Sequence, residues 1–212
     1  MTSLNGSTIT MILYDSTAAP NPRLVRIFMA EKGISIPLVQ VDLASGENRR
    51  EPFLSKNPMG GLPVLELDDG TCIAETVAIC RYLELEHTAT PLMGSSAREQ
   101  ALVEMWRRRA ESEIAMTIGN AFRHTHPFFA NRIKQCEPYG RLCLEQAPDK
   151  LAWLDGVLQK TPFIAGDTYT IADITALVWI DFGRVVNIRI GEHLPHLKRW
   201  HETVSARPSA SA

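Results

Sequence analysis

The stretch GGLPVLELDDGTCIAET, residues 60–76, decides the fold of the first half of the chain. Pro63 lacks a backbone donor and biases the residue before it to extended geometry, so it marks the start of a strand. Asp69 and Gly70 form a dipeptide typical of tight hairpin turns, and the strand-like runs PVLEL and TCIA flank it. The helical pattern of residues 75–86 follows at once. The stretch therefore predicts a hairpin that leads directly into a helix.

The chain before this hairpin alternates strand and helix signals. TITMILY, residues 8–14, is rich in β-formers, PRLVRIFMAEKGI has apolar residues at helical spacing, and IPLVQVDL returns to a strand pattern. REPFLSKNPMGG predicts a short helix and a loop. The first half is thus expected to form a small α/β sheet in the order β-α-β, an irregular connection, then β-β-α.

The second half of the chain has helical patterns almost throughout. After the link HTATPLMGSS, helical patterns cover residues 97–122, 137–158, 171–186 and 195–206. We therefore predict an α/β domain over 8–86, a linker over 87–95 and an all-α domain over 96–208.

Composition excludes several classes of partner. The 22 Lys and Arg against 24 Asp and Glu give a net charge of -2, which provides no basic field for nucleic acid or acidic membranes. The N-terminus has no secretory pattern and no apolar run is long enough to span a bilayer, so we expect a cytoplasmic protein with no membrane partner. Four cysteines without a CxxC spacing predict no metal site.

The hairpin also suggests a ligand. If the Leu62-Pro63 bond is cis, the backbone of Leu62 can pair with an extended peptide, as in recognition by strand addition. Glu75 can accept an ammonium group, and Thr76 opens a helix whose unpaired N–H groups favour a carboxylate. Glutathione offers a short peptide backbone, an ammonium and carboxylates. The alternative is that Pro63 only starts a strand and Thr76 only caps a helix.

Two motifs carry a family resemblance over residues 10–208. NPMGGLPVLELDDGTCIAETVAICRYLE resembles the glutathione-site signature of the soluble glutathione transferases, and PFIAGDTYTIADITA resembles the capping-box helix of their C-terminal domain. In that helix Thr170 and Asp173 can cap each other reciprocally. The resemblance implies a thioredoxin-like domain followed by an all-α domain, with glutathione as co-substrate and no metal.

By the same resemblance, Leu62 and Pro63 hold the cysteinyl part of glutathione, while Glu75 and Thr76 hold the γ-glutamyl end. The glycyl carboxylate needs a cation, and the irregular connection offers Arg49, Arg50 and Lys56. Lys56 is the first choice among the three.

The thiol of glutathione needs activation, because a free thiol with a pKa near 8.5 is mostly protonated at neutral pH. The family places a Tyr, Ser or Cys at the start of the first helix, and here that place falls at Ala18 or Ala19. Tyr14 lies inside the expected strand. Asn21, followed by Pro22, is expected to be the N-cap of the first helix, whose positive end would stabilise the thiolate.

The segment RRAESEIAMTIGNAFRHTHP is similar to a fungal and bacterial subclass that uses this helix dipole and a bound water. In that subclass a Ser and a His on the fourth helix are thought to hold the water. Gly119 and Arg123 occupy those places here, and Asn120 and His124, one position further on, lie four apart on one helical face. They are the candidate replacements. The alternative for His124 is a routine contact with the helix C-terminus.

The predicted activity is conjugation of glutathione to hydrophobic electrophiles. Phe122, Phe128 and Phe129 are expected to hold the electrophile between the two domains. The alternative is that these phenylalanines are core residues. The resemblance also implies a homodimer, and the segment EMWRRRAESE could supply Arg to Glu pairs between the two subunits. The alternative is that this segment is only a solvated helix face. The rival hypotheses are a glutathione-dependent peroxidase and a non-catalytic glutathione-binding regulatory or scaffold protein, favoured by Ala18 and Ala19.

Overall fold

A computed structural model describes residues 11–212 and divides the chain into two compact units, one up to Thr88 and one from Ala89. The strand predicted over 8–14 is present from Ile12 to Asp15, and its first three residues, 8–10, lie outside the described part. Each unit has its own buried core.

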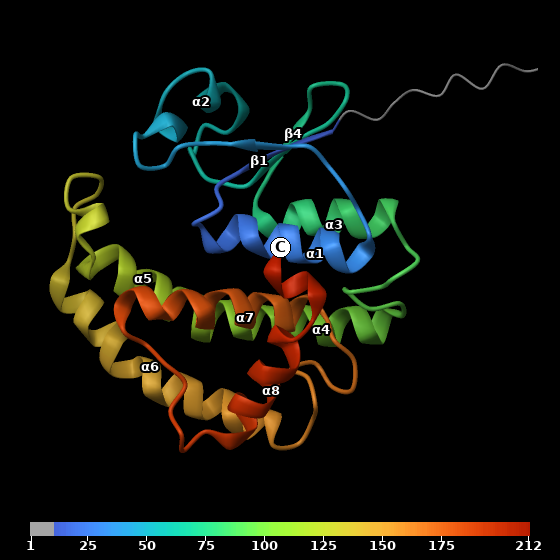
Figure 1. The fold of residues 1–212 in the computed structure, drawn as a ribbon, viewed down its shortest axis with the longest axis vertical. Helices are drawn as coiled ribbons and strands as arrows, with labels where there is room; N and C mark the ends of the chain where they lie inside the picture. The colour runs from blue at the N-terminus through green and yellow to red at the C-terminus, as the bar shows by residue number, and fades with distance from the viewer. Residues whose placement is uncertain (1–10) are drawn as a thin grey trace, which may run out of the picture. The chain divides into compact units, whose positions relative to one another are not determined.

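The first unit is built on a four-stranded mixed sheet in the order β2-β1-β3-β4 (Figure 1). Strands β1 and β2 are parallel, whereas β3 pairs antiparallel with both β1 and β4. The predicted hairpin is confirmed, because Leu65 pairs with Ile73 across the turn at Asp69 and Gly70. The strands are β1 Ile12–Asp15, β2 Leu38–Gln40, β3 Val64–Glu66 and β4 Cys72–Ala74.

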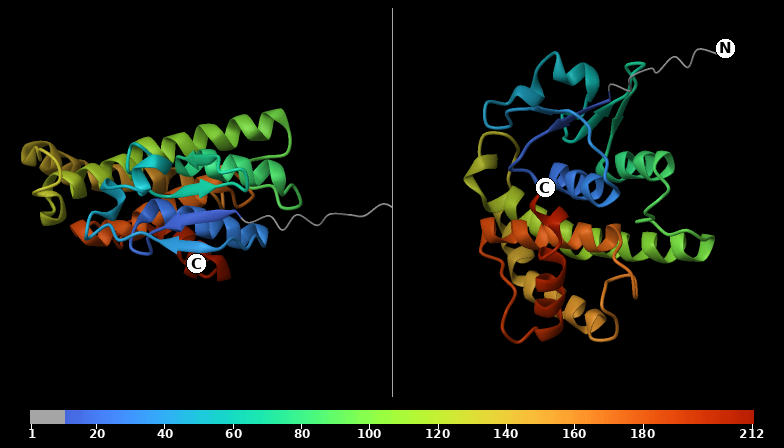
Figure 2. Two further views of the ribbon diagram at one scale, coloured as in Figure 1. Left: turned by 90° about the horizontal axis from the view of Figure 1, so that it is seen from above. Right: turned by 45° about the vertical axis from the view of Figure 1, so that its right-hand side comes forward.

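Helices cover both faces of this sheet. In Figures 1 and 2, α1 (Pro20–Lys32) and α3 (Thr76–Glu86) lie side by side on one face, and α2 (Phe53–Lys56) lies on the other. Of the apolar residues at helical spacing, Leu24, Ile27 and Phe28 are buried in α1, whereas Ile34 follows the end of the helix and is only partly buried. A short 3-10 turn, Glu47–Arg49, precedes α2. This is the thioredoxin-like arrangement that the sequence predicts.

The second unit contains only helices. The long first helix of this unit consists of α4 (Ala97–Ala110), a π-helical turn (Glu111–Ala115) and α5 (Met116–Thr125), and it extends three residues beyond the predicted end. The others are α6 (Glu137–Leu158), α7 (Ile171–Phe182) and α8 (Pro195–Ser205), with 3-10 turns at Pro127–Phe129, Gly183–Val186 and Pro208–Ser211. The predicted fold class, α/β followed by all-α, is confirmed.

Two capping boxes set helix starts in this unit. The predicted one is confirmed: Thr170 caps α7, and Asp173 accepts hydrogen bonds from the amide and hydroxyl of Thr170. A second box joins Ser96 and Glu99 at the start of α4. The spacing Ser-x-x-Glu is the sequence signal for it.

Among residues 11–212, no helix is both long enough and apolar enough to cross a bilayer.

Candidate functional site

Strand register brings three segments of the first unit to one end of the sheet. Val64, the first residue of β3, pairs with Tyr14 near the end of β1 and with Ala74 at the end of β4. The same end of the sheet therefore carries three features: the segment that leads into α1, the residue Leu62 and the start of α3. The candidate site is built there from main-chain groups and a few side chains.

Leu62 presents its backbone at this end. The Leu62-Pro63 peptide bond is cis. The side chain of Leu62 packs against a small cluster of Val41, Phe53 and Val64. Within the described residues, no hydrogen bond engages the amide or the carbonyl of Leu62. Both groups are therefore available to an extended peptide, as the ligand hypothesis requires.

Glu75 and Thr76 stand at the start of α3. Glu75 is the N-cap residue and has a φ of 69°, a left-handed conformation rare for a residue with a side chain. Such a conformation costs energy and is common at ligand sites. Its side chain is exposed and makes no hydrogen bond among residues 11–212, so it can accept an ammonium group. The amide of Thr76 heads an 11-residue helix, where a carboxylate is favoured.

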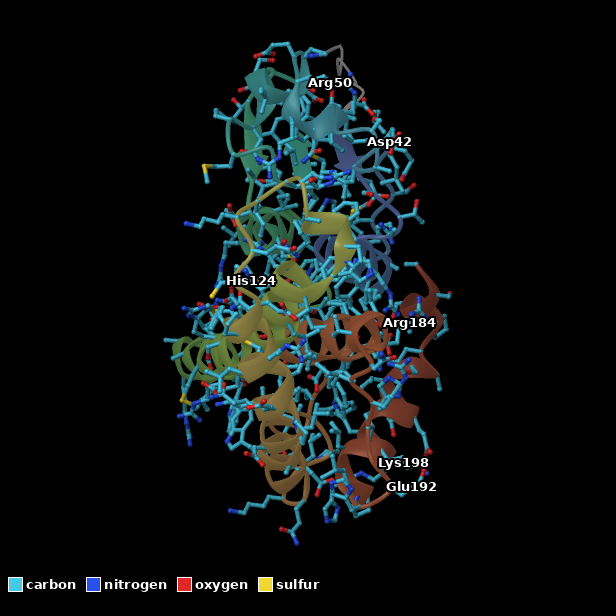
Figure 3. The ribbon with its side chains drawn as sticks, turned by 90° about the vertical axis from the view of Figure 1, so that its left-hand side faces the viewer. Asp42, Arg50, His124, Arg184, Glu192 and Lys198 are labelled. Carbon is cyan, nitrogen blue, oxygen red and sulfur yellow. The ribbon has the colours of Figure 1, made fainter. Side chains whose placement is uncertain are left out.

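The three candidate cations have different surroundings. The Lys56 ammonium donates to Glu66 Oε2 at 2.7 Å. Arg50 donates to the carbonyl of Ser45 at 3.2 Å, and Figure 3 labels it on the segment before α2. Arg49 donates to the carbonyl of Met59 at 3.2 Å, beside the turn that ends at Leu62. Of these cations, Lys56 is the one whose charge is already matched by a carboxylate.

Glu66 also accepts a hydrogen bond from the hydroxyl of Tyr14, at 2.7 Å and on the same oxygen. The ammonium of Lys56 lies 5.0 Å from the centre of the Tyr14 ring. The hydrogen bond to Glu66 raises the pKa of Lys56, and the bond from Lys56, followed by that from Tyr14, lowers the pKa of Glu66. Burial and the bond to Glu66 raise the pKa of Tyr14. Tyr14 lies in β1, as predicted, and its protonated hydroxyl donates to Glu66.

The start of α1 differs from the prediction. The N-cap is Ala19, which offers no side-chain cap, and Asn21 lies inside the first turn. The prediction of Asn21 as N-cap is therefore wrong: Pro20 also has the fixed φ of a first helical residue, and the helix starts there. The side chain of Asn21 is exposed and does not close the helix end.

Few main-chain donors remain at this helix end. Pro20 and Pro22 have no N–H, and the amide of Arg23 is bonded to the carbonyl of Ala19. Within the described part of the chain, the amides of Ala18 and Asn21 make no hydrogen bond. These two groups are the donors that could face a thiolate.

A polar network that the sequence did not reveal holds the loop before α1. The buried carboxylate of Asp15 accepts hydrogen bonds from Arg26 and from Gln40, each at 2.5 Å. The amide and hydroxyl of Thr17 donate to Gln40, at 3.1 Å and 2.8 Å. The contacts join residues distant in the sequence, so they fix the loop only once the sheet has formed.

Asn120 and His124 lie on one face of α5, as predicted from their spacing. Asn120 donates to the hydroxyl of Tyr139 at 3.1 Å, and Nδ1 of His124 accepts the amide of Cys136 at 3.1 Å. The His124 ring packs edge-on against Tyr139, and Figure 3 labels it on α5. Both side chains therefore contact the start of α6. The Nε2 atom of His124 makes no hydrogen bond within the described residues.

Phe122 is the centre of an aromatic cluster in the helical unit. Its ring centre lies 6.1 Å from that of Phe128 and 5.2 Å from that of Phe129. Phe182 of α7 packs edge-on against it at 4.9 Å. All four rings are only partly buried, so the cluster presents apolar surface.

Most of the charged residues of EMWRRRAESE pair within their own helix, whereas Glu113 accepts the ammonium of Lys150 on α6 at 2.5 Å. Arg107 bonds to Glu104 at 2.6 Å and to Glu111 at 2.7 Å, and Arg108 bonds to Glu111 at 3.0 Å. The proposed role of these residues in pairing two subunits is therefore not favoured, because their partners lie one helical turn away. Among the described residues, no three His, Cys, Asp or Glu side chains gather in a group that could hold a metal ion.

Comparison with known proteins gives this geometry a context. The family model described as glutathione S-transferase, N-terminal domain matches residues 9–84, and that of the C-terminal domain matches residues 117–208. "Glutathione S-transferase 2" of Saccharomyces cerevisiae is 35% identical over 203 residues, which cover 94% of this chain and 87% of the yeast protein.

Other relatives extend the comparison. A solved glutathione S-transferase domain-containing protein of Marinobacter aquaeolei is 40% identical, with a TM-score of 0.89 over 93% of this chain and 98% of that one. "Elongation factor 1-gamma 2" of Oryza sativa is 27% identical over 94% of this chain but only 47% of the rice protein. With both domain models matched in order and the yeast relative aligned over nearly its whole length, this chain belongs to the glutathione S-transferase family.

Proposed function

We propose that the protein is a cytoplasmic glutathione transferase that conjugates the thiol of glutathione to hydrophobic electrophiles. The observation that carries the proposal is the strand register around Val64. It brings the unpaired backbone of Leu62, the starts of α1 and α3, and the free carboxylate of Glu75 to one end of the sheet. Family membership supports the same assignment.

In the proposed complex, the amide and carbonyl of Leu62, positioned by Pro63, pair with the cysteinyl residue of glutathione. Glu75 accepts the ammonium of the γ-glutamyl end, and the amide and hydroxyl of Thr76 bind its carboxylate. Each of these groups has its bonding capacity unused within the described residues.

Arg49 is the best-placed cation for the glycyl carboxylate. A Cβ at Gly60 would lie 3.2 Å from both Cδ and Nη1 of Arg49, so the guanidinium lies against the turn that ends at Leu62. A guanidinium carries five N–H donors, and the bond to Met59 uses one of them. Arg50 and Lys56 remain further candidates, but Lys56 would have to break its ion pair with Glu66 to bind the glycyl carboxylate.

The thiolate would be stabilised by the positive end of α1. Dipole effects of this kind contribute about 0.3 to 2 kcal/mol, which lowers a thiol pKa by a fraction of a unit to about one and a half units. Because two prolines remove donors here, we expect the lower half of that range. A water held by Asn120 and His124 would supply the remaining hydrogen bond, and alanine at His124 would then raise the pKa of bound glutathione.

The electrophile would pack against the aromatic cluster of Phe122, Phe128, Phe129 and Phe182. An apolar surface of this kind binds hydrophobic groups and lowers the local dielectric, so that proximity and thiolate stabilisation together carry the rate. The guanidinium of Arg132 lies 4.1 Å from the centre of the Phe128 ring, and the His126 ring lies 4.7 Å from that of Phe122, so polar groups border the apolar surface.

We also propose that the protein is a homodimer. Helices α4, α5 and α6 carry large apolar side chains with exposures between 39 and 49%: Leu102, Met116, Tyr139 and Leu142. A second copy would cover these side chains in a two-fold arrangement.

A non-catalytic glutathione-binding role is the second candidate. Ala18 and Ala19 occupy the place of the family's catalytic side chain, and one relative is named as an elongation factor rather than a transferase. Glutathione-dependent peroxide reduction on the same site is a third, separated from the first by activity toward cumene hydroperoxide without conjugation.

The test is an ultraviolet titration of the thiolate of bound glutathione against pH, run alongside turnover with chlorodinitrobenzene. A pKa below that of free glutathione, together with turnover, supports the transferase. A pKa equal to the free value without turnover would instead favour the binding protein.

A further inference from the structure

Glu66 is the shared acceptor of a small polar cluster on the α2 face of the sheet. One of its carboxylate oxygens accepts hydrogen bonds from both the hydroxyl of Tyr14 and the ammonium of Lys56, each at 2.7 Å. The side chains of Lys56 and Glu66 are 23 and 24% exposed, so solvent screens their attraction only in part. This carboxylate thereby ties three elements together: β1, β3 and the end of α2.

Helix α2 depends on such contacts for its position. It has four residues and no side-chain cap, and a helix of that length has no stability of its own. At its start, Phe53 is buried against Val41 and Val64 and packs edge-on against the Tyr14 ring. At its end, the bond from Lys56 to Glu66 is the contact that anchors it to the sheet.

The end of α2 is coupled to the ligand-binding backbone by a second set of bonds. Asn57, directly after Lys56, donates to the carbonyl of Gly61 at 2.9 Å and accepts the amide of Met59 at 3.1 Å. The buried Asn48 donates to the carbonyl of Gly60 at 2.6 Å. The turn before Leu62 is therefore attached to α2, and a displacement of α2 would displace Leu62.

We propose that Glu66 is a positioning residue for glutathione binding: by holding Lys56 and Tyr14 it fixes α2, and α2 fixes the turn that presents the backbone of Leu62. The inference rests on the proposed function, in which this backbone binds the cysteinyl residue. It assigns Lys56 to holding the site rather than to contacting the ligand.

The two possible roles of Lys56 predict opposite results for Glu66→Gln. If Lys56 positions α2, the variant loosens the turn and weakens glutathione binding. If Lys56 binds the glycyl carboxylate directly, the variant releases its ammonium from a competing carboxylate and strengthens binding. The sign of the change therefore distinguishes a positioning role from a ligand role.

The experiment compares binding of glutathione and of γ-glutamylcysteine, which lacks the glycyl residue, by titration calorimetry. The matched control is Glu192→Gln, because Glu192 also accepts a lysine ammonium at 2.7 Å, from Lys198, in the helical unit (Figure 3). Two backbone hydrogen bonds to the ligand depend on the position of Leu62, so we expect Glu66→Gln to weaken binding of both ligands about tenfold, the value of about one such bond. Glu192→Gln should change neither.

Kinetics give a readout that a general loss of stability would not produce. We expect Glu66→Gln to raise the KM for glutathione while kcat and the KM for the electrophile stay within about twofold. Lys56→Met should reproduce the effect on both ligands, and the double variant should add little, since the two residues act as one unit. Tyr14→Phe removes one donor and serves as a milder variant if the others fail to fold.

Unchanged or tighter binding by Glu66→Gln would overturn the inference while leaving the proposed function in place. A loss confined to glutathione in Lys56→Met would overturn it as well, because that pattern marks a direct contact with the glycyl carboxylate. Absence of glutathione binding by the unaltered protein would overturn the proposed function and this inference together.

Discussion

Replacement of Asp173 tests the best-defined buried polar group of the fold. Its carboxylate is fully buried and accepts four hydrogen bonds, from the amides of Ile164 and Thr170, the Thr170 hydroxyl and the Trp200 indole. Asp173→Ala leaves three N–H donors without an acceptor, since the hydroxyl can turn elsewhere. Each unsatisfied buried donor costs about 1 to 3 kcal/mol, and relaxation of the site reduces the sum. We expect a loss of about 4 kcal/mol in the free energy of unfolding.

Urea unfolding followed by circular dichroism measures this loss. Asp173→Asn keeps one acceptor oxygen and should lose about half as much. Asp149→Ala is the control, because Asp149 is exposed on α6 and makes no hydrogen bond among the described residues; it should change stability by less than about 0.5 kcal/mol. A loss below about 1 kcal/mol in Asp173→Ala would refute the reasoning, since the four donors would then have other acceptors.

Three further predictions concern the candidate site and the subunit contact. Arg49→Gln should weaken glutathione about 10- to 150-fold, the value of one charge-assisted hydrogen bond, yet leave γ-glutamylcysteine unaffected in calorimetry; equal losses for both would remove Arg49 from the glycyl subsite. Leu142→Glu should shift the light-scattering mass from dimer to monomer, whereas Val185→Glu, exposed elsewhere, should not; a dimeric Leu142→Glu would place the contact on another face. The Lys56 to Glu66 pair should stabilise the fold between about pH 5 and pH 10. The pKa of Glu66 is lowered in the folded protein, so its contribution to stability is lost as the pH falls through that pKa. The pKa of Lys56 is raised in the folded protein, so its contribution to stability is lost as the pH rises through that pKa. The stability difference between the unaltered protein and Glu66→Gln should therefore shrink toward pH 3, and a constant difference would contradict the pairing.

The elements that could be predicted from the sequence are those whose chemistry is local. The Asp69-Gly70 turn and the Thr170-Asp173 cap each depend on residues within four positions, and both are present. The start of α1 was misplaced by two residues because Pro20 and Pro22 give the same first-turn signal, and the actual N-cap, Ala19, has no polar side chain to mark it.

The side-chain assignments that could not be predicted depend on distant partners. Lys56 looked like a free cation, but its charge is matched by Glu66 and its ammonium lies over Tyr14, contacts that exist only after β1 and β3 pair. Arg26 likewise meets Asp15 only once α1 packs on the sheet. A pattern of charges identifies candidates, whereas strand register decides which of them remain available to a ligand.

The prolines at the start of α1 make the thiolate proposal testable through the main chain itself. Main-chain donors cannot be removed by ordinary substitution, but one can be added: Pro20→Ala restores an N–H at the first helical position, where the side chain is only partly buried. If this helix end stabilises the thiolate, the added donor should contribute about 0.3 to 1 kcal/mol and lower the thiol pKa by about 0.2 to 0.7 units. The ultraviolet titration of bound glutathione measures the shift, with calorimetry to verify that affinity is retained. A variant that binds glutathione normally with an unchanged thiol pKa would show that the thiol does not face this helix end, and the activating group would then have to be sought among side chains such as His124.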